Sequence, residues 1–598
     1  MDQIPNQDNL KDKDSLSADS GQSQDFSEKE SYEQEYLIEQ KRILDQKEKD
    51  LQSKLDELQQ NNQALEAREL KLNQKIQNLQ DREDNLRQQL LELKNKQQLL
   101  EDKLKKESEK KDNLCQALIF EKGQAKLRSS YVDQSGNSLK ECYDVFSKDM
   151  FRSKLDLPNL GELEVIRHFN CLSKLNFSVD TNFYPLGSCT MKYSPKINDY
   201  LAGLDGFSNI HPYQDQKDIQ GALKLIYSLG QLLSKITGME RFSLQPSSGA
   251  QGELCGLLMI KKFHQSRGNN KTTVIIPDSA HGTNPATVSM CGFKTLVVKS
   301  DAKGLVDIDA LKSLVDDQTA AIMLTNPNTL GLFEENISDI KDIVHKNGGL
   351  LYYDGANFNP LLGITNPALM GFDVVHLNLH KTFSTPHGCG GPGAGVVGVG
   401  KKLLEYLPTP LVLEKNGEYY FDYDLKHSIG RLRSFYGNFG VLVRAYAYIL
   451  RLGKEGLLRV ALNSVLNANY IRTSLKDYYQ VPFPGVCMHE VVFSCSKQAE
   501  RGALALDIAK RLIDYDMHPP TMYFPLIVKE ALMVEPTETE SKETLDYFIA
   551  TMKKIDKEID TDIDNLKKSP LTTCVGRVDE VKAARTPDLN FFFSDKKK

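Results

Sequence analysis

Residues 371–400 read GFDVVHLNLHKTFSTPHGCGGPGAGVVGVG, and this stretch decides the fold class. An apolar run from Val374 to Leu379 ends at His380 and Lys381, and a hydroxyl-rich turn and a cluster of glycines follow. A short apolar run bounded by turn residues is typical of a buried strand. Open α/β sheets bind their ligands at the carboxyl ends of such strands. The stretch therefore predicts a buried strand that presents one lysine to a ligand.

An acidic residue stands at the end of the preceding predicted strand. Residues 349–357 read GLLYYDGAN, a second apolar run that ends at Asp354. One strand-connection-strand unit separates Asp354 from Lys381, a spacing that sets the ends of two parallel strands side by side. Such a pair suits pyridoxal phosphate (PLP), which is carried on a lysine and needs an acidic partner for its ring nitrogen. A cap or a surface ion pair would also explain the two residues, so they leave the question open.

Six segments of the chain resemble, in order, signature segments of the glycine cleavage system P-protein family. They are YPLGSCTMK at 184–192, LQPSSGAQGE at 244–253, DSAHGTNPAT at 278–287, TNPNTLG at 325–331, DGANFNPLLG at 354–363 and NLHKTFSTPHGCGGPG at 378–393. The similar region is about half as long as a single-chain P-protein and carries the lysine, so it resembles subunit 2 of the two-subunit form.

This resemblance implies the α/β fold of fold-type I PLP-dependent transferases, which is aspartate aminotransferase-like. It has a large domain with a mostly parallel sheet and a smaller α+β C-terminal domain, here preceded by a long coiled-coil helix. The expected boundaries are 1–30 disordered, 31–122 coiled coil, 123–160 linker, 161–220 N-terminal arm, 221–445 large PLP-binding domain and 446–598 small C-terminal domain.

The resemblance also implies an activity and its partners. The activity is PLP-dependent decarboxylation of glycine, with transfer of the aminomethyl group to the lipoyl arm of H-protein. The partner is a homologous subunit 1 in a heterotetramer. Lys381 is expected to carry PLP as a Schiff base, Asp354 to hold the ring nitrogen, and His281 to stack on the ring. His380 is a candidate for proton handling.

Residues 244–258, LQPSSGAQGELCGLL, carry the clearest phosphate-binding pattern. Two hydroxyls and a glycine precede a predicted helix that begins near Ala250, so free backbone N–H groups and the helix dipole can meet a dianion. Ser248, Gly249 and Ala250 are the first candidates, and Ser247 is the next.

Two further groups of residues are candidates for contact with the ligands. At the end of the apolar run 321–325, Thr325 and Asn326 could reach the cofactor's ring oxygen or the substrate carboxylate. In the arm, five residues either line the mouth of the active site or only pack: Asn182, Tyr184, Ser188, Cys189 and Lys192.

Leucine recurs at every seventh position near the N-terminus. The positions are Leu37, Leu44, Leu51, Leu58, Leu65, Leu72, Leu79, Leu86, Leu93 and Leu100. A strict period of seven predicts a left-handed coiled coil, either with itself or with a helix of a partner, and Asn62 favours a parallel dimer in fixed register. The other reading is a lone solvated helix. Residues 1–30 are polar and are expected to be disordered.

Composition excludes several classes of function. The net charge of −6 gives no reason to expect nucleic acid. No apolar run reaches the ~18 residues of a membrane span, and no signal or transit peptide is evident, so a cytoplasmic location is expected. Ten cysteines without a CxxC pair are interpreted as reduced, buried thiols.

Two motif-like stretches do not predict ligand sites. GCGGPG at 388–393 matches GxGxxG, but no helix opens there, so no dinucleotide site is expected. Cys389 in this stretch stands where the family has glycine. His489 and Glu490 lack the second histidine of HExxH, so no metal site is expected.

Two alternative functions remain at this point. One is a PLP enzyme of another class, such as an amino-acid decarboxylase or a desulfurase, which would share the lysine, the acid and the histidine. The other is a coiled-coil scaffold with a non-catalytic PLP-fold domain.

Overall fold

The computed structural model describes residues 161–387 and 393–587, residue 589, and short pieces between 39 and 160, of which 68–86 is the longest. The chain divides into two units, residues 1–106 and 107–598, which are described separately. Among the described residues, no helix has the length and apolar character needed to cross a membrane.

A seven-stranded sheet forms the centre of the second unit, in the order β1-β7-β6-β5-β4-β2-β3. The strands are β1 (Arg241–Ser243), β2 (Thr273–Pro277), β3 (Lys294–Val298), β4 (Thr319–Thr325), β5 (Leu350–Gly355), β6 (Val374–Asn378) and β7 (Gly395–Val399). Strands β2 to β6 are parallel, and β7 is antiparallel to both of its neighbours. Every residue of β4, β5 and β6 is buried, which explains their continuous apolar runs. The predicted strands around Asp354 and before Lys381 are confirmed.

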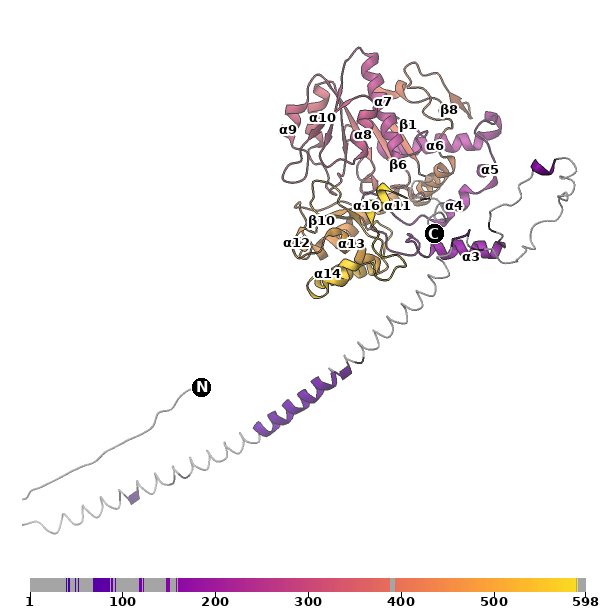
Figure 1. The fold of residues 1–598 in the computed structure, drawn as a ribbon. Coiled ribbons are helices and arrows are strands. Elements are labelled where there is room, and N and C mark those ends of the chain that lie inside the picture. The colour runs from indigo at the N-terminus through magenta and orange to yellow at the C-terminus, as the bar shows by residue number, and fades with distance from the viewer. Residues whose placement is uncertain are drawn as a thin grey trace, which may run out of the picture. The chain divides into compact units, whose positions relative to one another are not determined.

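Helices cover both faces of this sheet (Figure 1). On one face α7 (Gly249–Ser266) and α8 (Thr283–Met290) share a core with β2, β4 and β5. On the other face the core contains residues of five α-helices. These are α4 (Lys196–Ala202), α6 (Gln220–Thr237), α9 (Ile308–Leu314), α10 (Ile337–Lys346) and α11 (Phe439–Leu475). The large domain is thus a three-layer α/β/α structure, as the fold class predicts.

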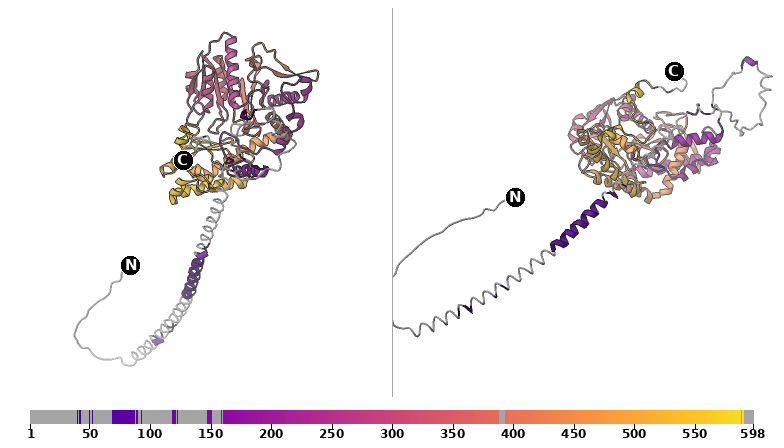
Figure 2. Two further views of the ribbon diagram at one scale, coloured as in Figure 1. Left: turned by 45° about the vertical axis from the view of Figure 1, so that its right-hand side comes forward. Right: turned by 60° about the horizontal axis from the view of Figure 1, so that its bottom comes forward.

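A smaller α+β domain follows α11, whose last turns belong to its core through Ala468, Ile471 and Leu475. Its antiparallel sheet has the order β10-β12-β11, with β10 (Val491–Ser494), β11 (Thr521–Met522) and β12 (Ala531–Val534). Its helices are α12 (Ser496–Glu500), α13 (Ala505–Ile513), α14 (Lys542–Thr561), α15 (Ile563–Lys568) and α16 (Glu580–Arg585). The left-hand view of Figure 2 shows these elements, in orange and yellow, grouped below the large domain.

The remaining elements lie at the start of the second unit, between β5 and β6, and after β7. They are η1 (Lys148–Met150), α3 (Glu162–Ser173), α5 (Asp205–Ser208), η2 (Gln216–Ile219), η3 (Asn359–Leu361), η5 (Lys401–Tyr406) and the hairpin of β8 (Leu411–Lys415) and β9 (Glu418–Asp422).

The segment between α3 and α4 packs on the small domain. Ser188 and Thr190 have positive φ angles of 63° and 46°. Their backbone N–H groups donate to Glu490 Oε2 at 2.8 Å and to Glu535 Oε2 at 3.0 Å. Residues other than glycine rarely adopt this conformation without support from their surroundings, so these two hydrogen bonds help to fix the turn.

Lys192, at the end of this turn, is a buried cross-link and not part of the active-site mouth. Its Nζ donates to Asn359 Oδ1, to Thr382 O and to Glu538 Oε1, each at 2.8 Å. The side chains of Lys192 and Glu538 are only 1% and 6% exposed. The pair therefore ties the arm to both domains.

Replacing Lys192 with methionine is expected to destabilise the protein by about 3 kcal/mol or more, because it leaves the Glu538 carboxylate buried without its cation. Urea denaturation followed by circular dichroism measures this. The matched control is Lys196→Met, which breaks an exposed ion pair with Asp180 and should cost less than about 1 kcal/mol. Equal losses in the two variants would contradict the assignment.

In the first unit, residues 68–86 are helical, in agreement with the predicted helix. Leu72, Leu79 and Leu86 are 59%, 62% and 61% exposed, so nothing in the described part of this unit covers them. Most of the predicted coiled coil, the predicted disorder at 1–30 and most of the linker 123–160 lie outside the described residues. Pairing of the helix remains a prediction.

The cysteine prediction needs a correction. Cys171 is disulfide-bonded. Cys574 is free but exposed, whereas four other free cysteines are buried, namely Cys255, Cys291, Cys487 and Cys495. The sequence has no CxxC spacing and so gave no signal for this disulfide bond.

Candidate active site

The predicted strand-end residues meet at one edge of the large sheet. His281 follows β2, Thr325 ends β4, Asp354 lies near the end of β5, and Lys381 follows β6. They line one cavity of about 400 Å³. The lining residues are Gly187, Ser188, Cys189, Ser248, Gly249, Ala250, Glu253, His281, Thr283, Thr325, Thr329, Asp354, Ala356, Asn357, His376, Asn378, His380, Lys381, His387, Thr521 and Phe524.

Asp354 is buried at the bottom of this site and is held by three groups. His376 Nε2 lies 3.2 Å from Oδ1, the N–H of Ala356 donates to Oδ1 at 3.0 Å, and Asn284 Nδ2 donates to Oδ2 at 3.1 Å. Burial alone would raise the pKa of Asp354, but His376, these hydrogen bonds and the charge of Lys381 outweigh it and lower the pKa. Asp354 is therefore an anion suited to hold a proton on a bound ring nitrogen.

His376 orients Asp354 and was missed at the sequence level. Residues Asp354 and His376 are directly paired in register between β5 and β6. Burial lowers the pKa of His376, so the ring is neutral. Its Nδ1 lies 2.9 Å from the hydroxyl of Tyr352, which leaves Nε2 to donate to Asp354. The only sequence signal was a histidine within an apolar strand.

Glu253 of α7 is a second acidic residue in the cavity that sequence reasoning did not single out. It is buried, and Asn284 Nδ2 lies 3.1 Å from both Glu253 Oε2 and Asp354 Oδ2. Burial, with the nearby charge of Asp354, raises the pKa of Glu253 to about 7. The only hint was its position one turn into the predicted helix.

The N-terminus of α7 faces the cavity, as the phosphate-binding pattern predicts. Ser248 is the N-cap residue, and its Oγ accepts from Gln251 N. Gly249 and Ala250 follow as the first two helical residues, with no intrahelical acceptor for their N–H groups. A Cβ on Gly395 would overlap Ser248 O, so β7 needs a glycine to approach this turn.

Ser247 and Asn326 do not line the cavity. Both the N–H and the hydroxyl of Ser247 donate to Gln251 Oε1, at 2.7 and 2.8 Å. Asn326 Oδ1 accepts from the N–H of Glu334 at 2.9 Å, so this side chain stabilises the following loop. By contrast, Thr325 lines the cavity, and its buried Oγ1 has no hydrogen-bond partner in the structure.

The two histidines proposed for catalysis have different surroundings. His281 is exposed to the cavity, and its ring meets Phe524 edge-on with centroids 5.5 Å apart. His380 lies against Ala394 O and His387, and burial and the charge of Lys381 lower its pKa to about 3. A histidine whose pKa lies this far below neutral pH binds a proton too weakly to act as a base there, so this environment gives no support to His380 as a proton carrier.

The arm residues divide between the two roles left open by the sequence. Ser188 and Cys189 line the cavity. Tyr184 stacks on His518 at 3.7 Å, and Asn182 Nδ2 donates to Asp516 O, so both pack on the small domain. Residues 388–392, including Cys389, lie outside the described residues, so the effect of that cysteine stays open.

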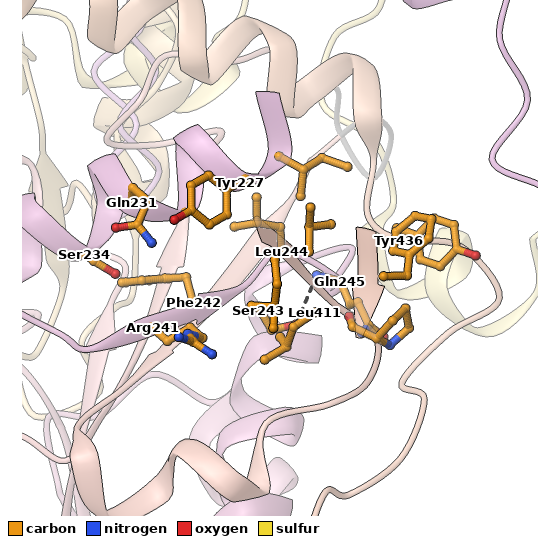
Figure 3. Close-up of a pocket in the computed structure, with 16 residues that line it drawn as sticks. Tyr227, Gln231, Ser234, Arg241, Phe242, Ser243, Leu244, Gln245, Leu411 and Tyr436 are labelled. Atoms are coloured by element: carbon orange, nitrogen blue, oxygen red, sulfur yellow. Dashed lines mark hydrogen bonds between the residues drawn. The ribbon is translucent and has the colours of Figure 1, made fainter. Parts of the chain in front are cut away.

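A second pocket lies at the edge of the sheet formed by β1, between α6 and the hairpin of β8 and β9 (Figure 3). It is about 40 Å³ in volume and is lined by residues such as Tyr227, Gln231, Arg241 and Tyr436. None of its lining residues is an acid or a lysine, and it is too small for a cofactor. The candidate catalytic residues Lys381, Asp354 and His281 therefore line the larger cavity.

The sheet order, the helical layers and the strand-end site define the fold-type I fold of PLP-dependent enzymes. Solved structures agree. The chain matches glycine decarboxylase (P-protein) of the glycine cleavage system with a TM-score of 0.59 and 20% identity, covering 70% of this chain and 95% of that one. Glutamate decarboxylase from Lactobacillus brevis matches with a TM-score of 0.54 and 15% identity, covering 71% and 97%. At these identities the matches show the fold alone.

Sequence comparison identifies the family. Residues 146–418 match the family model of the glycine cleavage system P-protein, and residues 460–573 match the glycine dehydrogenase C-terminal domain. "Probable glycine dehydrogenase (decarboxylating) subunit 2" of Caldanaerobacter subterraneus is 56% identical over 454 residues, which is 76% of this chain and 94% of the relative. The protein of the same name in Bacillus licheniformis is 56% identical over 75% of this chain and 93% of the relative. The chain belongs to the glycine dehydrogenase (decarboxylating) subunit 2 family.

Proposed function

We propose that this chain binds PLP and decarboxylates glycine, passing the remaining aminomethyl group to the lipoyl arm of H-protein. One observation carries the proposal: a single cavity is lined by Lys381, by the Asp354 anion and by the N-terminus of α7. The relatives named for glycine dehydrogenase support the choice of glycine, because they are more than half identical over most of the chain.

The residues of the cavity fit PLP. Helix α7 offers unpaired N–H groups and the positive end of its dipole to a phosphate, at Ser248, Gly249 and Ala250. Asp354 offers a buried anion to the ring nitrogen. Thr325 Oγ1 and Asn378 Oδ1 are buried polar atoms of the cavity lining without a hydrogen-bond partner, which a polar ligand can satisfy.

Each residue then has a definite task. Lys381 would hold the cofactor covalently and Asp354 would keep its ring nitrogen protonated. His281 would lie on the ring and help to set the angle of the leaving carboxylate. When bound, PLP supplies an electron sink for the carbon that loses CO2. Phe524 of the small domain and the arm residues Ser188 and Cys189 line the cavity and would limit the access of water to the bound substrate.

The proposed partners follow from the family. A homologous subunit 1 would complete the enzyme as a heterotetramer, and lipoylated H-protein would deliver the acceptor. The test uses the purified chain, alone and mixed with subunit 1. Reduction with borohydride should trap PLP on one lysine, and glycine with H-protein should then support exchange of labelled CO2. Trapping without exchange would point to a PLP enzyme of another class, and no trapping would remove the PLP premise.

For the N-terminal segment we propose association through the seam of leucines, with a second copy of the helix or with an equivalent helix of a partner. The exposed positions Leu72, Leu79 and Leu86 repeat every seven residues and need a covering helix. Deletion of residues 1–122 is expected to lower the oligomeric state in sedimentation velocity without loss of cofactor binding. An unchanged oligomeric state would leave the segment as a lone helix.

A further inference from the structure

We propose that Glu253 carries a proton and, through the hydroxyl group of Thr283, holds His281 in the tautomer whose ring proton is on Nε2. The three side chains form a row that leads from the buried side of the cavity to its open side. Glu253 Oε1 lies 3.0 Å from Thr283 Oγ1, and Thr283 Oγ1 lies 2.9 Å from His281 Nδ1. The meaning of this arrangement for catalysis rests on the proposed function, but the positions of the protons do not.

The tautomer of His281 follows from a backbone contact. The N–H of Thr283 donates to His281 Nδ1 at 3.2 Å. A backbone N–H can only donate, so Nδ1 must be the acceptor and the ring proton of the neutral imidazole is on Nε2. Burial lowers the pKa of His281, which agrees with a neutral ring.

The proton on Glu253 follows from the hydroxyl group. Since Nδ1 has no proton, the 2.9 Å contact is a hydrogen bond only if Thr283 Oγ1 donates. A hydroxyl group has one proton, so Thr283 can then only accept from Glu253 Oε1. If Glu253 were ionised, one of the two contacts would place two lone pairs face to face. A protonated Glu253 satisfies all three contacts.

The other oxygen of Glu253 has the partners of a carbonyl. Oε2 lies 3.1 Å from Asn284 Nδ2, which donates to it. Thr287 Oγ1 lies 3.2 Å from Oε2 and 2.9 Å from Thr283 O, so its one proton can serve only one of these two acceptors. Asn284 also donates to Asp354, so one amide joins the two acids. Two buried carboxyl groups this close do not readily ionise together, and Asp354 is the one held as an anion by other donors.

The titratable groups that face Glu253 come from three neighbouring elements. They are Asp354 and Tyr352 on β5, His376 on β6, and His281 in the loop before α8. Asp354 is the anion among them, and the pKa of about 7 for Glu253 has burial and this anion as its main causes. Raising the pH through this value removes the proton, and Thr283 must then turn its hydroxyl to Glu253.

Glu253 is thus a positioning residue that acts on the cofactor through His281. With Nδ1 occupied, the ring orientation of His281 is fixed and Nε2–H is the donor that remains for a ligand in the cavity. Above neutral pH this control weakens, because the hydroxyl of Thr283 no longer donates to Nδ1.

The test observes the tautomer in the full-length, cofactor-free chain by nitrogen NMR of ¹⁵N-labelled histidine, with His281→Asn to assign the signal. In the wild type, the backbone N–H of Thr283 should keep the Nε2–H form at every pH, and the ¹⁵N signal of Nδ1 should move as the pH rises through about 7 and the Thr283 hydroxyl turns to Glu253. Glu253→Gln keeps a donor toward Thr283 and should hold the Nδ1 signal at its low-pH position at every pH. Thr283→Val removes the hydroxyl, so the Nδ1 signal should stop following the pH step.

Infrared difference spectra across the same pH range provide the second readout. The wild type should lose an un-ionised carboxyl band as the pH rises through about 7, and Glu253→Gln should lack that band. Glu335→Gln, at an exposed position, should leave the band unchanged. A His281 proton on Nδ1, a pH step that survives in Thr283→Val, or no carboxyl band assignable to Glu253 would overturn the proposal. These readouts need no PLP, so they stand apart from the test of the proposed function.

Discussion

Replacing Lys381 with alanine is expected to remove the absorbance band of the cofactor linked to the lysine and to lower glycine-dependent CO2 exchange by on the order of 10⁴-fold. Lys381 is the lysine among the residues that line the cavity, and its charge acts on Asp354, His281 and His380. The alanine removes the nucleophile that anchors the cofactor, whereas the N-terminus of α7 can still bind its phosphate. Some PLP should therefore remain bound without being trapped by borohydride.

Peptide mapping of the reduced wild type checks this result, since the label must be on Lys381. The matched control is Lys401→Ala, at an exposed position beyond β7. It should keep the band and the exchange activity. A borohydride-trapped label on any other lysine would contradict the assignment of the anchor.

Replacing Asp354 with asparagine is expected to lower CO2 exchange by about 10²- to 10⁴-fold while PLP is still trapped on Lys381. The buried anion is lost, so the ring nitrogen is no longer held protonated and the ring accepts electrons poorly. The NH2 group of the asparagine would also face His376 Nε2 or Asn284 Nδ2, and each of these is itself a donor, so one hydrogen bond is lost. The measurement is the exchange rate per trapped cofactor.

Asp373→Asn is the matched control for Asp354. Asp373 is also a buried acid with a lowered pKa, despite its burial, because His345, the N–H of Leu351 and Lys402 surround it. It precedes β6, at the edge of the sheet away from the cavity. Its substitution should lower stability but leave the exchange rate per cofactor unchanged. Equal kinetic losses in the two variants would mean that Asp354 is structural.

Residues that lie where a strand or a helix begins or ends could be placed from the sequence. The apolar runs before Asp354 and Lys381 are buried parallel strands, and parallel strands bring their carboxyl ends to one edge. The hydroxyl-glycine pattern before α7 placed Ser248 and Gly249 correctly at the cavity. These are local patterns, and local patterns specify where an element begins and ends.

Contacts that depend on register or on the path of a loop could not be predicted. The pairing of Asp354 with His376 needs the register of β5 against β6, which no single strand encodes. The orientation of the Asn326 side chain depends on the loop that leads to Glu334. Its amide oxygen accepts from the N–H of Glu334, so the side chain does not line the cavity. Glu253 and Asn284 meet only because α7 and α8 pack on the same face of the sheet.

The turn that carries Ser188 and Thr190 has one more consequence. Its two N–H groups bind Glu490 and Glu535, and burial, with mutual repulsion in the case of Glu490, raises the pKa of both carboxyl groups, for Glu535 to about 7. These hydrogen bonds attach the arm to the small domain. Ser188, in the same turn, also lines the cavity. The arm, the large domain and the small domain therefore all contribute residues to the lining of the cavity. The large domain alone would supply the lysine and the acid, but it would lack the lining residues Ser188, Cys189, Thr521 and Phe524.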